Sequence, residues 1–246
     1  MIKKTKTAIK KILEVSFGVY NLCDHFVINY FDKSSVIVDL GAGKGEFSSC
    51  ILRKFPCCRI ILVEPAPSQV KEIAKKFESQ KKIEILEAAI GNKTNNNARF
   101  YLGKNWEENS LHKSLIVGKE DQTEIKIRVV TLKDIFSLYH LEKIDLLKVD
   151  IEGAEWDVLE NFSKLDFERI SQISVEFHDF LDPSLRLRTD RSVRILKELG
   201  YSFIYAGTGY MYGTPYSNCL FYDKRRLKRA SPAKWVTIPK RISDKL

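Results

Sequence analysis

The stretch VIVDLGAGKGEF (residues 36–47) decides the fold, because an apolar strand pattern runs into three closely spaced glycines and then a helical pattern. Residues 36–40 form the apolar run, and Phe47, Ile51 and Phe55 recur at helical spacing. Glycines permit a tight turn and a close backbone approach to a ligand, and the start of the following helix offers unpaired N–H groups. A strand–turn–helix unit that binds a nucleoside is therefore expected here.

The alternation of strand and helix patterns continues along the chain. Apolar runs predict further strands at residues 59–64, 83–90, 98–103, 125–131, 144–150, 169–177, 201–207 and 218–223. Helical spacing predicts a helix capped by Ser68, one over 131–139, one along Ala154, Val158 and Phe162, and one that ends at Gly200. This order predicts an α/β fold with a mostly parallel sheet and helices on both faces. Because only ten residues separate Gly207 from Asn218, the last two strands are expected to form an antiparallel pair at the edge.

An acidic residue follows the glycines at the distance that a nucleoside site requires. Glu64 ends the second strand, 64 − 41 = 23 residues after Gly41. An acid at that strand end is placed to accept both ribose hydroxyls. The spacing of Gly41, Gly43 and Gly45 matches neither the dinucleotide fingerprint nor a P-loop. An NAD-dependent oxidoreductase is therefore less expected, and a purely structural turn is the alternative to a nucleoside site.

A second polar group follows the strand at 144–150, in KVDIEGAEWDVL (148–159). In an open parallel sheet, ligands bind beyond the carboxyl ends of the strands. Asp150 should therefore face the same edge as the glycines, with Glu152 close behind it. Glu155 and Asp157 are also explained by favourable charge at a helix N-terminus.

The next strand ends in VEFHD (175–179), which brings Glu176 and His178 toward Asp150. His178 is the first choice of general base, because an ordinary histidine pKa near ~6.5 suits proton removal at neutral pH. Asp150 is the second choice, and Glu152 and Glu176 complete the candidate catalytic set. In an alternative interpretation, Asp150, Glu176 and His178 hold a divalent metal.

The motifs DLGAGKGEFS, LVEP, AAIGN, VVTLKDI, DLLKVDIEGAEWDVL and VEFH, in this order over roughly residues 34–223, resemble the FkbM family of S-adenosylmethionine-dependent methyltransferases. The resemblance implies a Rossmann-like class I methyltransferase fold. It also implies methyl transfer to hydroxyl groups, often on sugars of glycolipids or polysaccharides. An O-methyltransferase that acts on a glycan is therefore the expected function.

The same resemblance implies how the cofactor is held. The acid at Asp39 would lie near the methionine end of S-adenosylmethionine, the glycine loop beneath it, and Glu64 at the ribose. Ala88, Ala89 and Ile90 would flank the adenine, and Glu87 would accept from its amino group. The expected cofactor-binding set is Asp39, Gly41, Ala42, Gly43, Gly45, Glu64, Pro65, Ala89, Ile90 and Asp150.

The net charge of +9 is concentrated at the two ends of the 246-residue chain. Residues 224–246 carry nine Lys/Arg and one Asp, and residues 1–16 carry five Lys and one Glu. We therefore expect an N-terminal segment (1–33) with an amphipathic helix over 9–20, a methyltransferase domain (34–223) and a basic tail (224–246). The tail is interpreted as a solvated segment, a contact to anionic membrane or a nucleic-acid contact.

Three rival functions follow: an RNA methyltransferase, a small-molecule methyltransferase, or a non-catalytic nucleic-acid-binding protein on the same scaffold. No apolar run approaches the roughly 20 residues that span a bilayer, and Lys10, Lys11 and Glu14 interrupt any signal-peptide pattern. Five cysteines without metal-ligand spacing indicate reduced thiols. The expected location is cytoplasmic, or peripheral to the inner membrane face. The loop 103–124 is expected to shape the acceptor pocket.

Overall fold

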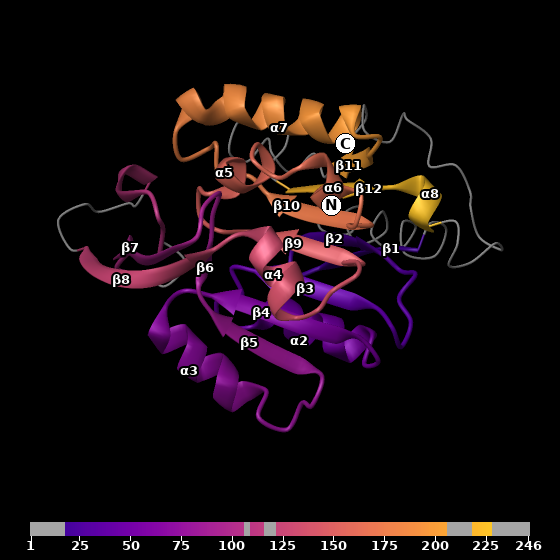
Figure 1. The fold of residues 1–246 in the computed structure, drawn as a ribbon, viewed down its shortest axis with the longest axis horizontal. Helices are drawn as coiled ribbons and strands as arrows, with labels where there is room; N and C mark the ends of the chain where they lie inside the picture. The colour runs from indigo at the N-terminus through magenta and orange to yellow at the C-terminus, as the bar shows by residue number, and fades with distance from the viewer. Residues whose placement is uncertain (1–17, 106–108, 116–121, 206–217, 228–246) are drawn as a thin grey trace, which may run out of the picture.

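The computed structural model describes residues 18–105, 109–115, 122–205 and 218–227, and a seven-stranded sheet forms its centre (Figure 1). The strand order is β11-β12-β10-β9-β3-β4-β5. Neighbouring strands are parallel except β12, which is antiparallel to β10 and β11, so the predicted fold class and the antiparallel pair are confirmed. The strands are β3 (Val36–Leu40), β4 (Arg59–Glu64), β5 (Ile83–Glu87), β9 (Leu146–Val149), β10 (Gln172–Glu176), β11 (Ser202–Tyr205) and β12 (Asn218–Tyr222).

Helices cover both faces of this sheet, because consecutive residues of β3 are buried on both faces. Val38 and Leu40 pack into the larger core with the helices of one face, and Ile37 packs into a second core with those of the other. The first face carries α4 (Leu132–Leu138), α5 (Glu155–Leu159), α6 (Lys164–Phe167) and α7 (Arg186–Glu198). The second carries α2 (Glu46–Lys54) and α3 (Pro67–Lys76).

A β-hairpin formed by β1 (Val19–Leu22) and β2 (His25–Ile28) lies on the second face. The backbone N–H and carbonyl of Ile28 bond to the side-chain amide of Gln172 on β10. Part of the expected N-terminal helix is therefore wrong, because Tyr20 lies in a strand and the described part of segment 1–33 contains this hairpin. Residues 1–17 of that segment lie outside the described residues.

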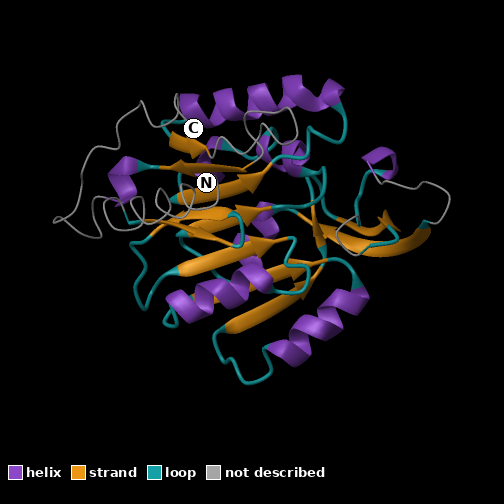
Figure 2. Cartoon of the chain, turned by 180° about the vertical axis from the view of Figure 1, so that it is seen from behind, coloured by secondary structure: helices purple, strands orange, loops and turns teal. Residues whose placement is uncertain are grey.

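A small three-stranded sheet, which we call the arm, projects from the same molecule (Figures 1 and 2). Its strands are β6 (Ala89–Ile90), β7 (Asn95–Leu102) and β8 (Thr123–Val130), followed along the chain from β7 by the 3₁₀ turn η2 (Lys113–Leu115). The predicted strand at 83–90 is thus divided at Ala88, because β6 pairs with β8 and leaves the main sheet. In Figure 2 the arrows of the parallel strands point toward the side on which the arm lies.

Two helix predictions change in detail. Ser68 is not the N-cap of α3, since the cap is Ala66 and Pro67 opens the helix, which its missing N–H permits. The helix predicted along Ala154, Val158 and Phe162 ends earlier, at Leu159. A separate helix, α6, begins after Ser163 with a reciprocal capping box to Asp166.

The remaining elements agree with the sequence or extend it. The end of α7 is confirmed, with Gly200 in the left-handed region at φ 91°. The turns η4 (Pro183–Leu185) and α8 (Lys224–Leu227) were not predicted, and residues 228–246 of the basic tail lie outside the described residues. Among the described helices, none has the length and hydropathy of a bilayer span, and none of the five cysteines forms a disulfide.

Candidate active site

The candidate site begins with a row of side chains across three neighbouring strands. Asp39 on β3 lies beside Lys148 on β9, and Lys148 lies beside Ser174 on β10. Side chains two residues further along a strand point to the same face, so Asp150 and Glu176 form the next row. The predicted acids therefore lie at the same edge and on the same face as Asp39.

The glycine loop approaches Asp150 so closely that no other residue fits. Gly41 has φ 74°, and a Cβ atom there would lie 1.8 Å from the backbone oxygen of Asp150. The backbone N–H of Asp150 in turn donates to the carbonyl of Leu40 over 3.3 Å. At Gly45, a Cβ atom would lie 2.6 Å from the ring of Phe77. Gly41 is therefore required for the contact between this loop and the residue after β9, and Gly45 for the contact with Phe77 after α3.

Lys148 joins the glycine loop to the acids. Its Nζ donates to the carbonyl of Gly41 over 2.6 Å and lies 3.2 Å from Asp39 Oδ1 and 3.1 Å from Asp150 Oδ2. The side chain is only 3% exposed. Burial opposes the charge, but the carboxylates of Asp150 and Asp39 outweigh it and raise the pKa of Lys148. Ser48 adds a hydrogen bond of 2.6 Å to Asp39 Oδ2.

Glu64 lies at the other side of the glycine loop, where a ribose was expected. Its carboxylate accepts the backbone N–H groups of Gly43 (2.8 Å) and Ala66 (2.9 Å). Burial raises its pKa to about 7, in spite of these two hydrogen bonds. Of the residues expected near the adenine, Ala89 and Ile90 are both buried, so their contact with a cofactor stays a prediction.

His178, the predicted general base, is held between carboxylates. Its Nδ1 lies 2.9 Å from Glu155 Oε1, and its Nε2 lies 3.2 Å from Glu152 Oε2 and 3.8 Å from Asp150 Oδ1. Burial lowers the pKa of His178, but the charge and hydrogen bond of Glu155 and the charges of Glu152 and Asp150 raise it well above its ordinary value. His178 was chosen as general base because an ordinary histidine pKa suits that role. This environment raises its pKa above the ordinary value.

The carboxylates near His178 differ from one another in their proton affinity. Burial opposes ionisation of Asp150, yet Lys148, His25 and His178 outweigh it and hold its pKa well below the usual range. Burial raises the pKa of Glu152 to about 8, and the charge of Asp150 adds to that effect. Burial and Asp150 also raise the pKa of Glu176. We call Asp150, Glu152, Glu155, Glu176 and His178 the acid–imidazole cluster.

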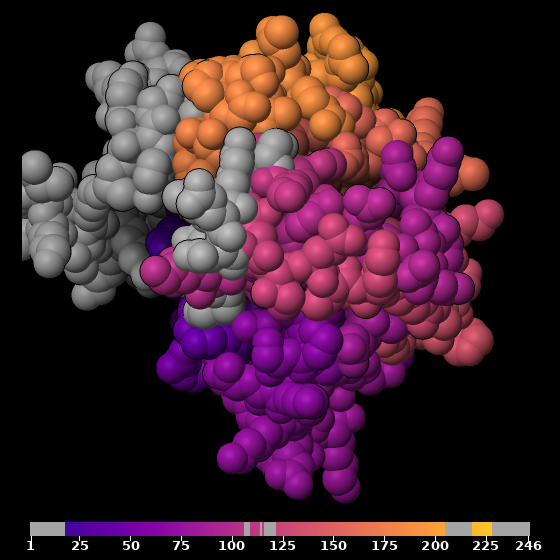
Figure 3. All heavy atoms as spheres, turned by 90° about the vertical axis from the view of Figure 1, so that its left-hand side faces the viewer, coloured from indigo at the N-terminus to yellow at the C-terminus, as the bar shows by residue number. Residues whose placement is uncertain are grey.

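The described residues 109–115, which follow β7, brace the turn that follows Asp150. Glu152 has a positive φ of 51°, and Gly153 follows it at 96°. The hydroxyl of Ser110 donates to the Glu152 carbonyl over 2.6 Å, and Leu115 leaves no room for a side chain at Gly153. Figure 3 looks onto this edge of the molecule, with the arm in magenta across its middle. Residues 106–108 and 116–121 of the predicted acceptor loop lie outside the described residues.

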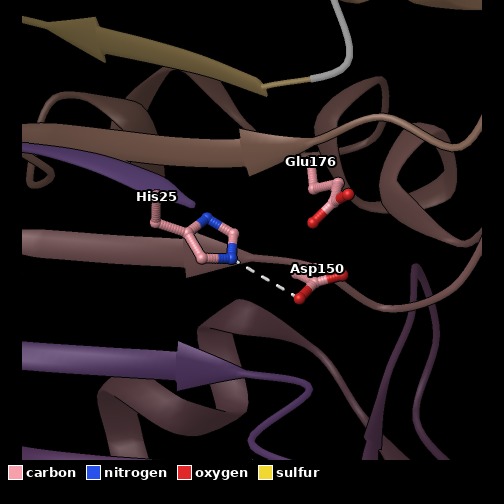
Figure 4. A group of neighbouring side chains, drawn as sticks. All are labelled: His25, Asp150 and Glu176. Carbon is pink, nitrogen blue, oxygen red and sulfur yellow. Dashed lines mark ion pairs between the residues drawn. The ribbon is translucent and has the colours of Figure 1, made fainter. Parts of the chain in front are cut away.

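His25 is a site residue that the sequence did not reveal (Figure 4). It is 3% exposed, its Nε2 lies 3.5 Å from Asp150 Oδ2, and its Nδ1 lies 3.3 Å from the hydroxyl of Ser174. Its ring also packs edge-on against Phe47. The N-terminal segment was expected to be helical, so nothing in the sequence placed His25 beside Asp150. Lys148 was also missed, although a lysine inside an apolar strand is a recognisable signal.

The alternative metal set predicted from the sequence is divided by the structure. His25, Asp150 and Glu176 form one group whose candidate ligand atoms lie within 4.8 Å of one another. Asp150, Glu152 and His178 form a second such group. Glu176 and His178 therefore belong to different groups, which share Asp150.

Comparison with known proteins places the chain among methyltransferases. The model of the methyltransferase FkbM domain matches residues 39–203. The chain is 26% identical over 166 residues to Methyltransferase 1 of Beauveria bassiana, covering 61% of this chain and 67% of that protein. It is 28% identical over 182 residues to Methyltransferase sdnD of Sordaria araneosa, covering 62% and 70%. The crystal structure of methyltransferase FkbM from Methylobacillus flagellatus KT is similar over 78% of this chain, with 18% identity and a TM-score of 0.49, and the chain spans 44% of that one.

Proposed function

The chain belongs to the FkbM methyltransferase family, and from that premise we propose that it transfers a methyl group from S-adenosylmethionine to a hydroxyl group of a carbohydrate. The observation that carries the proposal is the bridge made by Lys148. One buried ammonium contacts the glycine loop, Asp39 and Asp150 together. A nucleoside held at the loop is therefore adjacent to acids that can handle the proton of an acceptor.

The residues at the loop fit this cofactor. Gly41 and Gly43 bring backbone close to the sheet edge, and Glu64 presents a carboxylate beside them. Asp39 supplies a second buried acid on the same edge. When bound, S-adenosylmethionine supplies an electrophilic methyl group on a sulfonium, so that an oxygen–carbon bond forms as the sulfur–carbon bond breaks.

The acid–imidazole cluster would take up the hydroxyl proton. Glu155, which is fully buried, holds His178 in its charged form, so His178 positions its neighbours rather than acting as the free base. Glu152 lies against His178 Nε2, and its side chain is 30% exposed. We assign proton uptake to the ionised form of Glu152, which a pKa of about 8 makes predominant above that pH, with His178 fixing its orientation and Asp150 accepting a hydrogen bond from the acceptor.

The charge of the site supports a hydroxyl-bearing, uncharged acceptor. Asp150, whose pKa is held low, lies here beside four further carboxyl groups, and the ionised carboxylates would repel the phosphates of RNA. Several carboxylates can accept hydrogen bonds from neighbouring hydroxyls of one sugar. A carbohydrate is therefore favoured over a nucleic acid, and the small-molecule methyltransferase remains the second candidate.

Calorimetric titration with S-adenosylmethionine and with NAD, followed by a glycan methylation screen monitored by mass spectrometry, tests the proposal. We expect binding of S-adenosylmethionine alone and a mass gain of one methyl group on a glycan. Tight NAD binding, or methylation of RNA in place of every glycan, would contradict it.

Contact of the basic ends with anionic membrane is a further part of this proposal, since a lipid-linked glycan would be presented there. Co-sedimentation with anionic liposomes, with and without residues 224–246, is the measurement. Equal partition of the two forms would show that residues 224–246 do not contribute to membrane binding.

A further inference from the structure

We propose that His25, Asp150 and Glu176 bind a divalent metal cation on the acceptor side of the site. The cation's role in methyl transfer rests on the proposed function, but its binding does not. The three residues come from separate elements: the start of β2, the residue after β9 and the end of β10. One imidazole and two carboxylates are a ligand set that divalent cations such as Mn²⁺ and Zn²⁺ accept in proteins.

The geometry brings these three side chains to one point. Their candidate ligand atoms lie within 4.8 Å of one another, and the carboxylates of Asp150 and Glu176 both lie beside the imidazole edge in Figure 4. Each side chain is carried by the paired strands or by the residue next to them, so small side-chain rotations are enough to close the set around an ion. The central sheet positions the backbones of Asp150 and Glu176, and the hairpin that carries His25 is hydrogen-bonded to β10 through Ile28 and Gln172.

The surroundings of His25 fit a metal ligand. Its Nδ1 faces the hydroxyl of Ser174, a buried neutral group that can accept the ring N–H. A metal-binding histidine usually donates its second nitrogen in this way, which fixes the tautomer and the orientation of the ring. The Nε2 lone pair is then directed at the carboxylates of Asp150 and Glu176. In this tautomer, a cation between Nε2 and the two carboxylates would replace their repulsion by coordination.

The charge balance around His25 also calls for a cation. Asp39, Asp150 and the three glutamates 152, 155 and 176 supply five carboxylates. The described basic groups within ion-pair distance of them are Lys148, His178 and His25 itself. Lys148 would repel a metal near Asp150, but it is shared with Asp39 and neutralises only part of the charge. A divalent cation would offset much of what remains.

The second group, Asp150, Glu152 and His178, is a weaker candidate for the metal. Glu155 lies 2.9 Å from Nδ1 of His178 and Glu152 lies 3.2 Å from its Nε2, so both ring nitrogens already have carboxylate partners. His25 has only a neutral hydroxyl at its Nδ1. The two histidines therefore differ in whether Nε2 is available to a metal.

A cation at this point would leave coordination positions open to the acceptor oxygen, since the protein supplies three ligands. Coordination of a hydroxyl lowers its pKa. A lower hydroxyl pKa would favour proton transfer to Glu152. The proton would still move from the acceptor hydroxyl to the Glu152 carboxylate.

The test is a Mn²⁺ titration of the full chain after removal of metals with a chelator, followed by the loss of the free Mn²⁺ signal in electron paramagnetic resonance. We expect one bound Mn²⁺ per chain. His25→Gln and Glu176→Gln should each weaken binding at least about tenfold, the lower limit seen even for outer partners of metal ligands. His140→Asn is the matched control, because His140 is exposed, has a left-handed φ of 51° that asparagine accepts, and should not change binding.

Unchanged binding in both His25→Gln and Glu176→Gln, or no stoichiometric binding by the parent chain, would overturn the site. Loss of binding in Glu152→Gln alone would move the ion to the second group and also overturn it. Circular dichroism of each variant verifies that the fold is retained. If Mn²⁺ binds as expected while S-adenosylmethionine does not, the proposed function fails and the metal site stands.

Discussion

The two halves of the site are held together by different forces. On the cofactor side, the backbone N–H groups of Gly43 and Ala66, which lie at most 21 residues from Glu64 along the chain, bind the Glu64 carboxylate. On the acceptor side, charged side chains bind one another, and His25 reaches Asp150 from 125 positions away, since 150 − 25 = 125. The contacts of the glycine loop are therefore positioned mainly by nearby sequence, whereas the charged side chains are positioned by the packing of the whole sheet. Lys148 is the point at which the two halves meet.

The largest effect should come from breaking the contact between the halves at Gly41. In Gly41→Ala, the new Cβ would lie 1.8 Å from the Asp150 oxygen in a backbone conformation that alanine disfavours. We expect a loss of more than about 4 kcal/mol in the free energy of unfolding, together with lost S-adenosylmethionine binding. Thermal unfolding and calorimetry measure the two effects. Gly18→Ala is the control: Gly18 also has a left-handed φ, but a Cβ atom there would contact no neighbouring atom. It therefore measures the backbone strain without the steric clash.

Removing the shared cation should be the next most severe change. Lys148→Met leaves the fully buried Asp39 and the partly buried Asp150 without their common partner. Breaking a buried pair in this way costs about 3–5 kcal/mol of stability. Denaturant unfolding measures the loss, and Lys71→Met, on the exposed side of α3, is the control. Equal stability of the two variants would show that Lys148 does not join the halves.

The acceptor side alone is tested by Asp150→Asn and His178→Ala. Each should reduce turnover by about 10²–10⁴-fold, the usual contribution of positioned acid–base groups, while S-adenosylmethionine still binds. Asp190→Asn, at an exposed position of α7, should leave turnover unchanged. Parent-like turnover in both site variants would remove the acid–imidazole cluster from the mechanism.

The smallest effect concerns the pH dependence of the cofactor side. Because burial raises the pKa of Glu64 to about 7, this carboxyl is protonated below neutrality and accepts ribose hydroxyls poorly. Affinity for S-adenosylmethionine should therefore rise about tenfold from pH 6 to pH 8, following the ionised fraction. Stability should change in the opposite direction: the raised pKa favours the fold below the ordinary carboxyl pKa, and this advantage is lost as pH rises toward 7.

Calorimetry at several pH values provides the measurement, with Glu64→Gln expected to flatten the affinity profile. Glu72→Gln, on the exposed side of α3, should keep the parent profile. A pH-independent affinity in the parent chain would show that Glu64 does not hold the ribose.

Most of the fold and half of the site could be predicted from local patterns. The run from β3 through the glycines to α2, and Glu64 at the end of β4, were placed correctly because each signal lies within one element. The edge shared by Asp150 and Asp39 also followed, since parallel strands end together. The environment of His178 could not be predicted, because its pKa depends on Glu155 and Glu152, which the sequence assigns to a separate turn and helix.

The sequence by itself determined most of the strand and helix order from residue 36 onward, the glycine turn and the family, because these depend on residue types at short spacing. Only the tertiary structure decided which charges meet. The hairpin packs on β10 and thereby delivers His25 to Asp150, and Lys148 spans from β9 to the carbonyl of Gly41. Such contacts depend on how buried apolar faces dock, and the strength of a charge depends on the solvent that this docking excludes.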